Sequence, residues 1–102
     1  MIHVIATIRV VPNRRTEFLA EFGRILADVR AEAGCIEYGP TLEVNTGIAG
    51  VPEARQDVVI VVEKWESVSA LDAHLKSPHM FRYREKVKDL VTEVEIRVAS
   101  PA

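Results

Sequence analysis

The chain has 102 residues, of which 48% are hydrophobic and 27% charged, and its formal net charge is −2. These values are typical of a globular protein, and the length allows one domain, residues 1–102, with a modest core. Charges of both signs are interspersed, which leaves nucleic-acid binding without electrostatic support. The longest apolar run, 58–62, is too short to cross a membrane, and residues 1–4 lack a secretion-signal pattern. We therefore expect a cytoplasmic protein.

The first half of the chain predicts a strand followed by a long helix. Residues 2–11 alternate between an apolar set and a mixed set, as in a strand with one buried face. Apolar residues then recur at helical spacing over 14–32. Asn13 is a suitable N-cap for this helix, and Gly34 is expected to end it in the left-handed conformation.

The middle of the chain predicts two further strands separated by a long loop. Residues 35–44 are extended and interrupted at Gly39-Pro40, which gives either one bent strand or two short ones, and residues 45–55 form a glycine-rich loop. The strongest strand signal is 56–66, which is apolar on both sides, so both of its faces should be covered. Cys35, the only cysteine, is expected to be a small buried side chain because it can form no internal disulfide.

The last third predicts two short helices and a closing strand. Ser67 or Ser69 should cap a helix over 69–76, and Ser69 with Asp72 has the spacing of a capping box. Pro78 is at a position where a second helix can begin. This helix buries a stripe of Met80, Tyr83, Val87 and Leu90, and residues 92–98 alternate as a final strand.

The resulting order of elements is β-α-β-β-α-α-β. Four strands with helices on one face give an α+β fold, a ferredoxin-like split βαβ sandwich with an antiparallel sheet. The other face of the sheet stays open and is expected to carry Val59, Val61, Ile5 and Val11. An exposed apolar face usually meets a partner, and a second copy is the simplest one, so we expect a homodimer.

Several segments resemble the antibiotic biosynthesis monooxygenase family. They are "HVIATIRVVP", "EAGCIEYGP", "VVEKWES", "AHLKSPHM" and "TEVEIRVASP", and together they run over nearly the whole chain. The chain is most similar to the small quinol monooxygenases of that family. The resemblance implies a dimeric α/β-barrel with a pocket between each sheet and its helices. It also implies oxidation of a hydroxylated aromatic or quinol by molecular oxygen without a cofactor or metal.

Such an oxygenase needs a base, because a hydroquinone becomes a good electron donor once it is deprotonated. His74 is the first choice for this base, since the pKa of histidine, about 6.5, suits proton transfer near neutrality. Glu63 is the second choice if it is buried. A hydrogen-bonded core histidine and a solvated or lysine-paired glutamate are the structural alternatives for these two residues.

The pocket should also have aromatic walls. Trp65, at the end of its strand, offers a flat surface for a planar substrate and is grouped with His74 as catalytic, the alternative being core packing. Tyr38 offers a phenol for a substrate oxygen, the alternative being a place at a dimer interface. Met80, Phe81 and Tyr83 are further candidates, of which one or two should contact the substrate.

No metal site is expected. Five residues separate His74 from His79, so the two do not share a helix face as metal-binding pairs do. Haem degradation, known in the family, is disfavoured. The positions of its functional residues are occupied here by Thr7 or Ile8, His74 and Arg84, and none of these is of the required type.

Two alternatives remain open. One is isomerisation of a small phosphorylated ketone, with a histidine base and a cationic phosphate site. Arg82, Arg84, Lys86 and Lys88 are nearby, but they are interpreted as a solvated helix face. The other alternative is a non-catalytic dimeric barrel that binds a small ligand or a protein.

Overall fold

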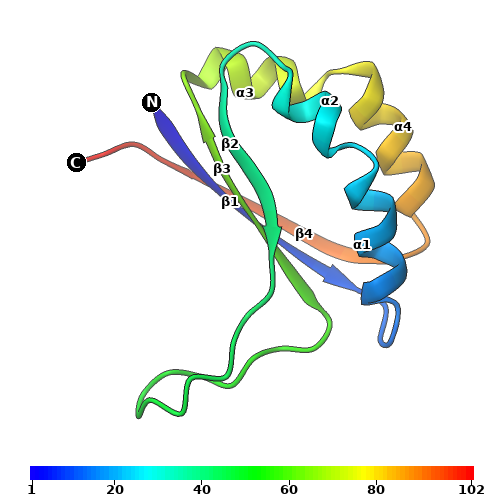
Figure 1. Cartoon of the computed structure of the whole chain (residues 1–102), viewed down its shortest axis with the longest axis vertical. Helices are drawn as coiled ribbons and strands as arrows, with labels where there is room; N and C mark the ends of the chain where they lie inside the picture. Colours follow the sequence, from blue (N-terminus) through cyan, green and yellow to red (C-terminus); the bar gives the residue numbers. More distant parts are fainter.

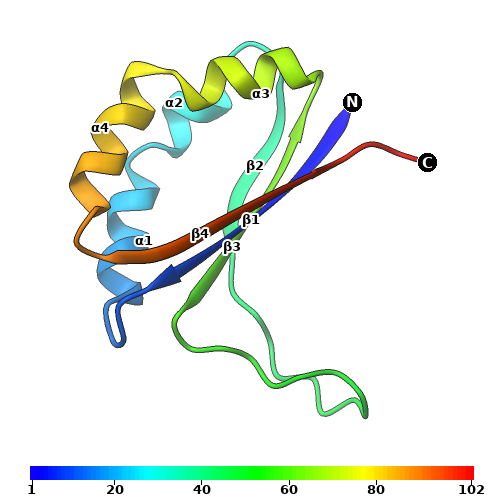
Figure 2. The same cartoon turned by 180° about the vertical axis from the view of Figure 1, so that it is seen from behind.

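One antiparallel sheet with all helices on one face forms the protein (Figures 1 and 2). The computed structural model describes residues 1–102. The strands lie in the order β2-β3-β1-β4, which confirms the ferredoxin-like α+β fold. No helix is long and apolar enough to cross a membrane. The elements are β1 (Ile2–Val10), α1 (Arg15–Gly23), α2 (Leu26–Arg30), β2 (Cys35–Thr41), β3 (Val58–Trp65), α3 (Val68–Leu75), α4 (Pro78–Val87) and β4 (Val91–Ala99).

The core lies between the sheet and the helices. The alternate residues of β1 from Ile2 to Val10 are buried there, as predicted. Val61 of β3 pairs with Ala6, and Val59 pairs with Ile8, so both valines face the helices and are buried. The expectation that Val59 and Val61 lie on the open face is therefore wrong, because strand register sets both valines on the helix side.

The open face of the sheet carries a different apolar set. Ile5, which is 42% exposed, pairs with Val62, and Ile60 lies two residues before Val62 on β3. Val11, also expected on this face, lies beyond the end of β1 and is half-buried. Ion pairs flank this apolar centre; they are Glu37–Lys64, Arg9–Glu93 and Glu95–Arg97.

The predicted helix over 14–32 is wrong at its centre and at its cap. The backbone tightens after Gly23, where the N–H groups of Arg24 and Ile25 bond to carbonyls three residues earlier, and α2 starts anew. Glycine weakens a helix at this point. Asn13 makes no capping bond; it has a φ of 69° inside the turn closed by Arg14 N–H and the Val11 carbonyl. Asparagine tolerates this left-handed conformation better than most residues.

Gly34 has the closest neighbour of the five glycines. Its φ is +84°, as predicted for a left-handed residue, and an added Cβ would lie 2.6 Å from the Cβ of Ala70. The Gly34 carbonyl also accepts the N–H of Glu66 at 2.9 Å. Gly34 therefore holds the start of β2 against the start of α3.

Strand β2 runs unbroken through Gly39-Pro40, so the alternative of one strand holds and that of two short strands is wrong. Its irregularity lies instead between Cys35 and Glu37. Because β2 is an edge strand of this sheet, Pro40 can occupy it without removing a ladder hydrogen bond. Cys35 is only half-buried, which corrects the expectation of a buried side chain.

The two short helices begin as separate units. Ser67 caps α3 by accepting the N–H of Ala70 at 3.1 Å, so the alternative capping box of Ser69 with Asp72 is wrong. Pro78 occupies the first turn of α4, as predicted. The Ser77 hydroxyl donates to the carbonyl of His74 at 2.8 Å and fixes the turn between the helices.

The segment between β2 and β3 forms a long arm that projects from one end of the sheet (Figure 1). Residues 42–57 contain no helix or strand. Arg55 binds the carboxylate of Glu43 through Nε and Nη2, each at 2.9 Å, which clamps the base of the arm. Asn45 accepts the N–H of Ala54 at 2.7 Å just beyond this clamp.

Candidate functional site

A buried pocket lies between the sheet and helices α3 and α4. Its cavity volume is about 110 Å³, and most of its lining is hydrophobic. An apolar cavity of about 150 Å³ holds benzene, so this pocket is on the scale of one aromatic ring. The lining residues are Ala6, Ile8, Phe22, Tyr38, Val61, Glu63, His74, Leu75, Met80, Tyr83, Arg84, Val94 and Ile96.

His74 reaches this pocket from the last turn of α3 and is only 1% exposed. Its Nδ1 lies 2.7 Å from Oε2 of Glu32, in the turn that precedes β2. A carboxylate acceptor fixes the proton on Nδ1, so Nε2 is the nitrogen with a free lone pair. Burial lowers the pKa of His74, and the Glu32 hydrogen bond opposes this shift. The ring is therefore held as a neutral imidazole in one tautomer.

Glu63 lines the same pocket from β3 and is 5% exposed. Its Oε1 accepts the indole N–H of Trp65 at 2.8 Å. Burial raises the pKa of Glu63 to about 7, although the Trp65 hydrogen bond acts against it. Glu63 therefore exchanges a proton near neutral pH, and it meets the condition of burial that its role as a second candidate base required.

Trp65 stands behind the pocket rather than in its wall. It is fully buried and does not line the cavity, so the expected flat wall for a substrate is wrong. Its ring packs on His74, with centroids 4.7 Å apart, while its N–H holds Glu63. The β3 register turns Trp65 to the helix side at the end of the strand, where α3 covers it. Trp65 therefore positions two polar pocket residues.

Aromatic rings supply one side of the pocket. Tyr38 stacks on Phe22 with centroids 5.7 Å apart and an angle of 8°, and it meets His74 in an edge-to-face arrangement with centroids 5.3 Å apart. Burial raises the pKa of the Tyr38 phenol, so it stays a neutral hydrogen-bonding group. Because Tyr38 is buried on the helix side, the alternative of a place on the open sheet face is wrong.

The remaining candidate residues lie on helix α4, and two of the three line the pocket. Met80 and Tyr83 are buried and line the pocket. Phe81 does not; it is 58% exposed, and the guanidinium of Arg84 lies 5.0 Å from its ring centroid. Its position is one residue off the buried stripe, which turns it outward. Phe81 is therefore no pocket residue.

Two polar residues of this region were not among the expected site residues. Glu32 follows α2 in a turn, where no periodic pattern points to it. Arg84 is exposed, as its interpretation as a solvated residue required, but it also lines the pocket, and its guanidinium donates to the carbonyl of Leu75. The only sequence signal for Glu32 was its place two residues before Gly34, the residue that brings its turn against α3.

The pocket continues toward strand β4. Val94 and Ile96 project on the helix side of β4, yet they are 52% and 45% exposed because no helix covers this edge. Ile8, Tyr83, Arg84 and Val94 also line a neighbouring groove along α4. A molecule in the pocket can therefore extend along an apolar strip.

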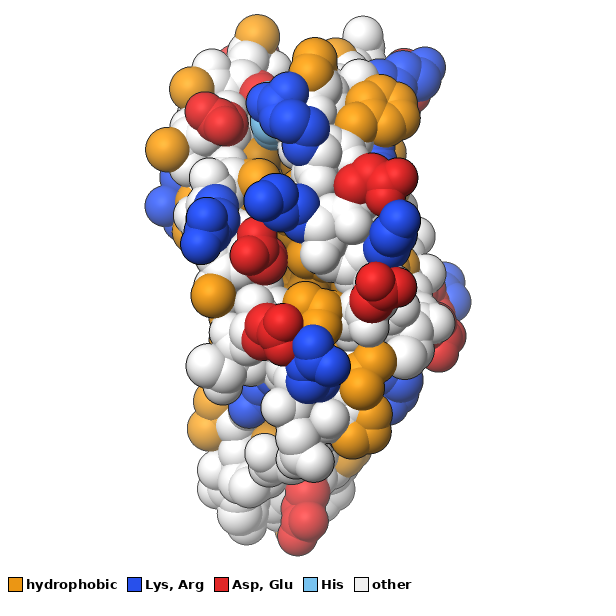
Figure 3. Space-filling view, turned by 90° about the vertical axis from the view of Figure 1, so that its right-hand side faces the viewer, with side chains coloured by type: hydrophobic (Ala, Val, Ile, Leu, Met, Phe, Trp, Pro, Cys, Tyr) orange, Lys and Arg blue, Asp and Glu red, His pale blue; other side chains and the backbone are white.

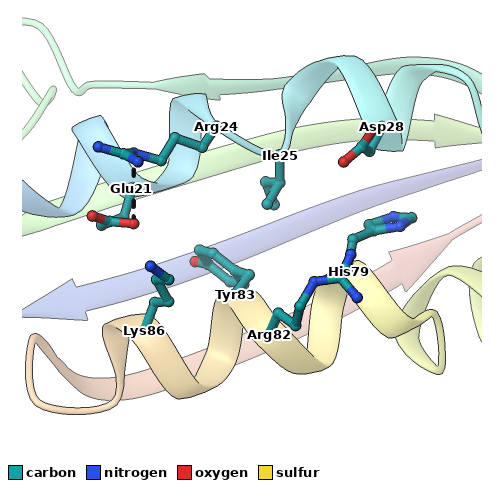
Figure 4. A pocket seen from close by; sticks show the side chains of 8 residues that line it. All are labelled: Glu21, Arg24, Ile25, Asp28, His79, Arg82, Tyr83 and Lys86. Carbon is teal, nitrogen blue, oxygen red and sulfur yellow. Dashed lines mark ion pairs between the residues drawn. The ribbon is translucent and has the colours of Figure 1, made fainter.

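A second depression, the outer groove, lies between α1–α2 and α4 on the other side of the helical layer (Figure 3). Its cavity volume is about 180 Å³, and charged side chains of both signs surround it (Figure 4). His79 lies at one end of this groove, and its Nε2 is 3.2 Å from the same Glu32 oxygen that contacts His74. Glu32 thus contacts one residue that lines the outer groove, His79, and one that lines the buried pocket, His74.

The sequence matches the family model described as antibiotic biosynthesis monooxygenase over residues 1–86. The match covers the sheet–helix unit up to the end of α4, including all residues of the pocket except those on β4. The chain therefore belongs to the antibiotic biosynthesis monooxygenase family, as its sequence segments suggested.

Individual relatives agree with this assignment. The chain is 39% identical over 103 residues to a protein of Escherichia coli named "Probable quinol monooxygenase YgiN", with 99% of this chain and 98% of that protein covered. The structure of Rv0793 from Mycobacterium tuberculosis is 29% identical, with a TM-score of 0.76 and 99% and 94% of the two chains covered. PA3566 of Pseudomonas aeruginosa shares the fold with a TM-score of 0.80 at 24% identity, over 99% and 93% of the chains.

Proposed function

We propose that the protein is a cofactor-independent monooxygenase that oxidises a small hydroxylated aromatic, and most specifically a quinol, with molecular oxygen. The observation that carries this proposal is the pair of proton-handling residues, His74 and Glu63, in an aromatic-walled apolar pocket. The name of the Escherichia coli relative supports a quinol as the substrate.

His74 acts as the base in this proposal. With Nδ1 held by Glu32, its Nε2 accepts the proton of a quinol hydroxyl in the pocket. The resulting quinolate is electron-rich and transfers electrons to oxygen. Glu63 and the Tyr38 phenol, which line the same pocket, are the groups we propose to hydrogen-bond the second quinol oxygen or the reduced oxygen species. The apolar walls exclude water from these intermediates.

The reaction balances without another reductant. A quinol and O2 give a hydroxyquinone and water. One oxygen atom forms a new C–O bond to the ring, and the other leaves as water with the two hydrogens that the substrate loses. All electrons come from the quinol, so the proposed chemistry requires neither a flavin nor a metal.

The pocket also limits the shape of the substrate. Its volume of about 110 Å³ accommodates one ring, whereas Val94 and Ile96 at its margin offer apolar surface for a second ring or an alkyl substituent. A fused two-ring quinol therefore matches the pocket together with the strip along β4.

The alternative of a phosphorylated ketone has less support. A phosphate site needs several cationic or N–H donors. Arg84 is the one cationic side chain in the pocket lining, and its guanidinium already donates to the Leu75 carbonyl. We therefore retain the quinol as the proposed substrate.

We also propose that the protein is a homodimer formed through the open face of the sheet. Ile5, Ile60 and Val62 form an apolar centre there, and ion pairs lie around it. An apolar centre with a charged rim is the usual arrangement of a protein interface. Two sheets packed in this way form the barrel that the family resemblance implies.

Oxygen uptake with chemically reduced menadione tests the activity. We expect uptake above spontaneous autoxidation, and a decrease of about 100-fold in His74→Gln, because a positioned base contributes on this scale. Glu32→Gln should reduce the rate by less, since it leaves the imidazole in place. His3→Gln is the matched control, because His3 lies on β1 outside the pocket lining.

Two outcomes would contradict the proposal in different ways. Uptake that is unchanged in His74→Gln would preserve the activity but exclude His74 as the base. Uptake no faster than autoxidation with one-ring and two-ring quinols, in protein that is folded, would reject the quinol as substrate.

A further inference from the structure

We propose that Glu32, His74 and His79 form a binding site for a first-row divalent cation, for which Zn²⁺ is the best-matched ion. Nothing in the family assignment calls for this site. It follows from the convergence of two imidazole nitrogens on one carboxylate oxygen, an arrangement that the spacing of the two histidines in the sequence did not lead us to expect.

The fold brings the three residues together from two regions of the chain. Nδ1 of His74 lies 2.7 Å and Nε2 of His79 lies 3.2 Å from Oε2 of Glu32. The three ligand atoms all lie within 4.8 Å of one another. Neighbouring ligand atoms of a tetrahedral zinc site are roughly 3.3 Å apart, given zinc–ligand distances of about 2.0–2.1 Å. Small outward shifts of the side chains would therefore admit the ion.

The helix break explains why sequence spacing failed to predict this site. His74 lies in the last turn of α3 and His79 in the first turn of α4, and the Ser77-Pro78 turn separates the two helices. The Ser77 hydroxyl holds the His74 carbonyl, so the turn is fixed on the side of the cluster. The two rings thus meet across a turn instead of along one helix face.

The donor set matches zinc. Two histidine nitrogens and one carboxylate oxygen, with a fourth position for water, are the ligands of many open zinc sites. The nearby Cys35 is not part of the cluster. Burial and the charge of Glu32 raise the pKa of its thiol.

The outer groove gives the cation a route to the site. The side chains of Glu32 and His79 are 14% and 18% exposed, whereas His74 is nearly fully buried. His79 and Asp28 lie at the same end of the groove (Figure 4). A cation can thus approach from the groove without passing through the buried pocket.

Cation binding would change the state of His74, a consequence that rests on the proposed function. A cation on Nδ1 takes the place of the proton that Glu32 now holds there. The neutral ring then carries its proton on Nε2, the nitrogen that has to accept the substrate proton. The site would therefore switch the base off, which makes the cation an inhibitor of the oxygenase.

Calorimetric titration of the chelator-treated protein with ZnCl₂ tests the site without relying on turnover. We expect one saturable ion per chain, and affinity at least about tenfold weaker in His79→Gln and in Glu32→Gln. His3→Gln and Cys35→Ser are the matched controls and should bind like the wild type. Circular dichroism of each variant checks that the fold is retained.

A second measurement follows the His74 nitrogens directly by ¹⁵N NMR. Zn²⁺ should move the proton from Nδ1 to Nε2, and His79→Gln should reduce this effect at equal Zn²⁺. The proposal is overturned by absence of binding to the wild type or by equal binding in His79→Gln. Failure of oxygen uptake would leave these results untouched, so the two proposals are tested separately.

Discussion

The substitution Glu63→Gln tests the electrostatics of the pocket through the stability of the protein. The pKa of Glu63 is about 7 in the folded protein, against 4.5 for an ordinary glutamate. The folded state therefore binds more protons than the unfolded state between these values. The contribution of Glu63 is fully present below about pH 4.5 and is lost as the pH rises to about 7.

The size of this loss follows from the shift. One pKa unit corresponds to about 1.4 kcal/mol, so the wild type should lose about 3 kcal/mol of unfolding free energy across this range through Glu63. Glutamine does not titrate, and its amide oxygen can still accept the Trp65 N–H. The advantage of Glu63→Gln over the wild type should therefore grow by about 3 kcal/mol between pH 4.5 and pH 8.

Urea unfolding followed by circular dichroism at fixed protein concentration measures this difference. Glu66→Gln sets the baseline, because it removes a carboxylate from an exposed position on the same segment. A stability difference between wild type and Glu63→Gln that stays constant from pH 4.5 to pH 8 would refute the reasoning. A difference that grows in the opposite direction would show that Glu63 is stabilised as a carboxylate.

Three further predictions concern the scaffold. Gly47→Ala should cost about 1–2 kcal/mol, for the left-handed backbone alone. Gly34→Ala should destabilise the protein clearly more, because of these two glycines only Gly34 has a neighbouring atom where the new Cβ would lie. Equal losses of stability in thermal unfolding of the two variants would contradict this prediction. Glu43→Gln should speed trypsin cleavage at Arg55 without lowering the global unfolding midpoint, since the ion pair is exposed; an unchanged cleavage rate would argue against the clamp. Val62→Lys should convert a dimer to monomers in analytical ultracentrifugation, and a dimer that survives would place the interface elsewhere.

Periodicity predicted most of the fold because it reports which side of an element is buried. The alternation of β1 was predicted correctly for this reason, and so was the buried stripe of Met80, Tyr83 and Val87 in α4, which Leu90 continues in the following turn. The errors arose where a local signal competes with packing. Gly23 interrupts a helix whose apolar spacing continues, and Pro40 is tolerated because β2 is at an edge.

Register was the main source of error on the sheet. Strand β3 is apolar on both sides, so its sequence does not reveal which side meets the helices. Pairing with β1 decides this, and it assigns Val59 and Val61 to the core. The same pairing buries Glu63 and Trp65 beneath the helices. From the sequence alone, Glu63 could have been either solvated or buried.

The candidate site was predictable in part. His74 was recognised because it lies beside the leucines of a short helix, and it does line the pocket. Its partner Glu32 was missed, because the two residues are 42 positions apart and meet only through the contact at Gly34. Side-chain direction decided the remaining cases, since Phe81 and Met80 are neighbours in sequence but only Met80 points into the core.

The projecting arm of residues 42–57 divides the chain into two interlocking pieces. The first piece carries Glu32 and Tyr38, while the second carries Glu63 and His74. Neither piece holds a whole sheet. Strand β3 of the second piece pairs with β1 and β2 of the first piece, and β4 of the second piece pairs with β1. A chain opened within the arm would therefore yield two fragments that complete each other only on association. The arm is thus a natural cut point for a split reporter in which assembly and site formation are the same event.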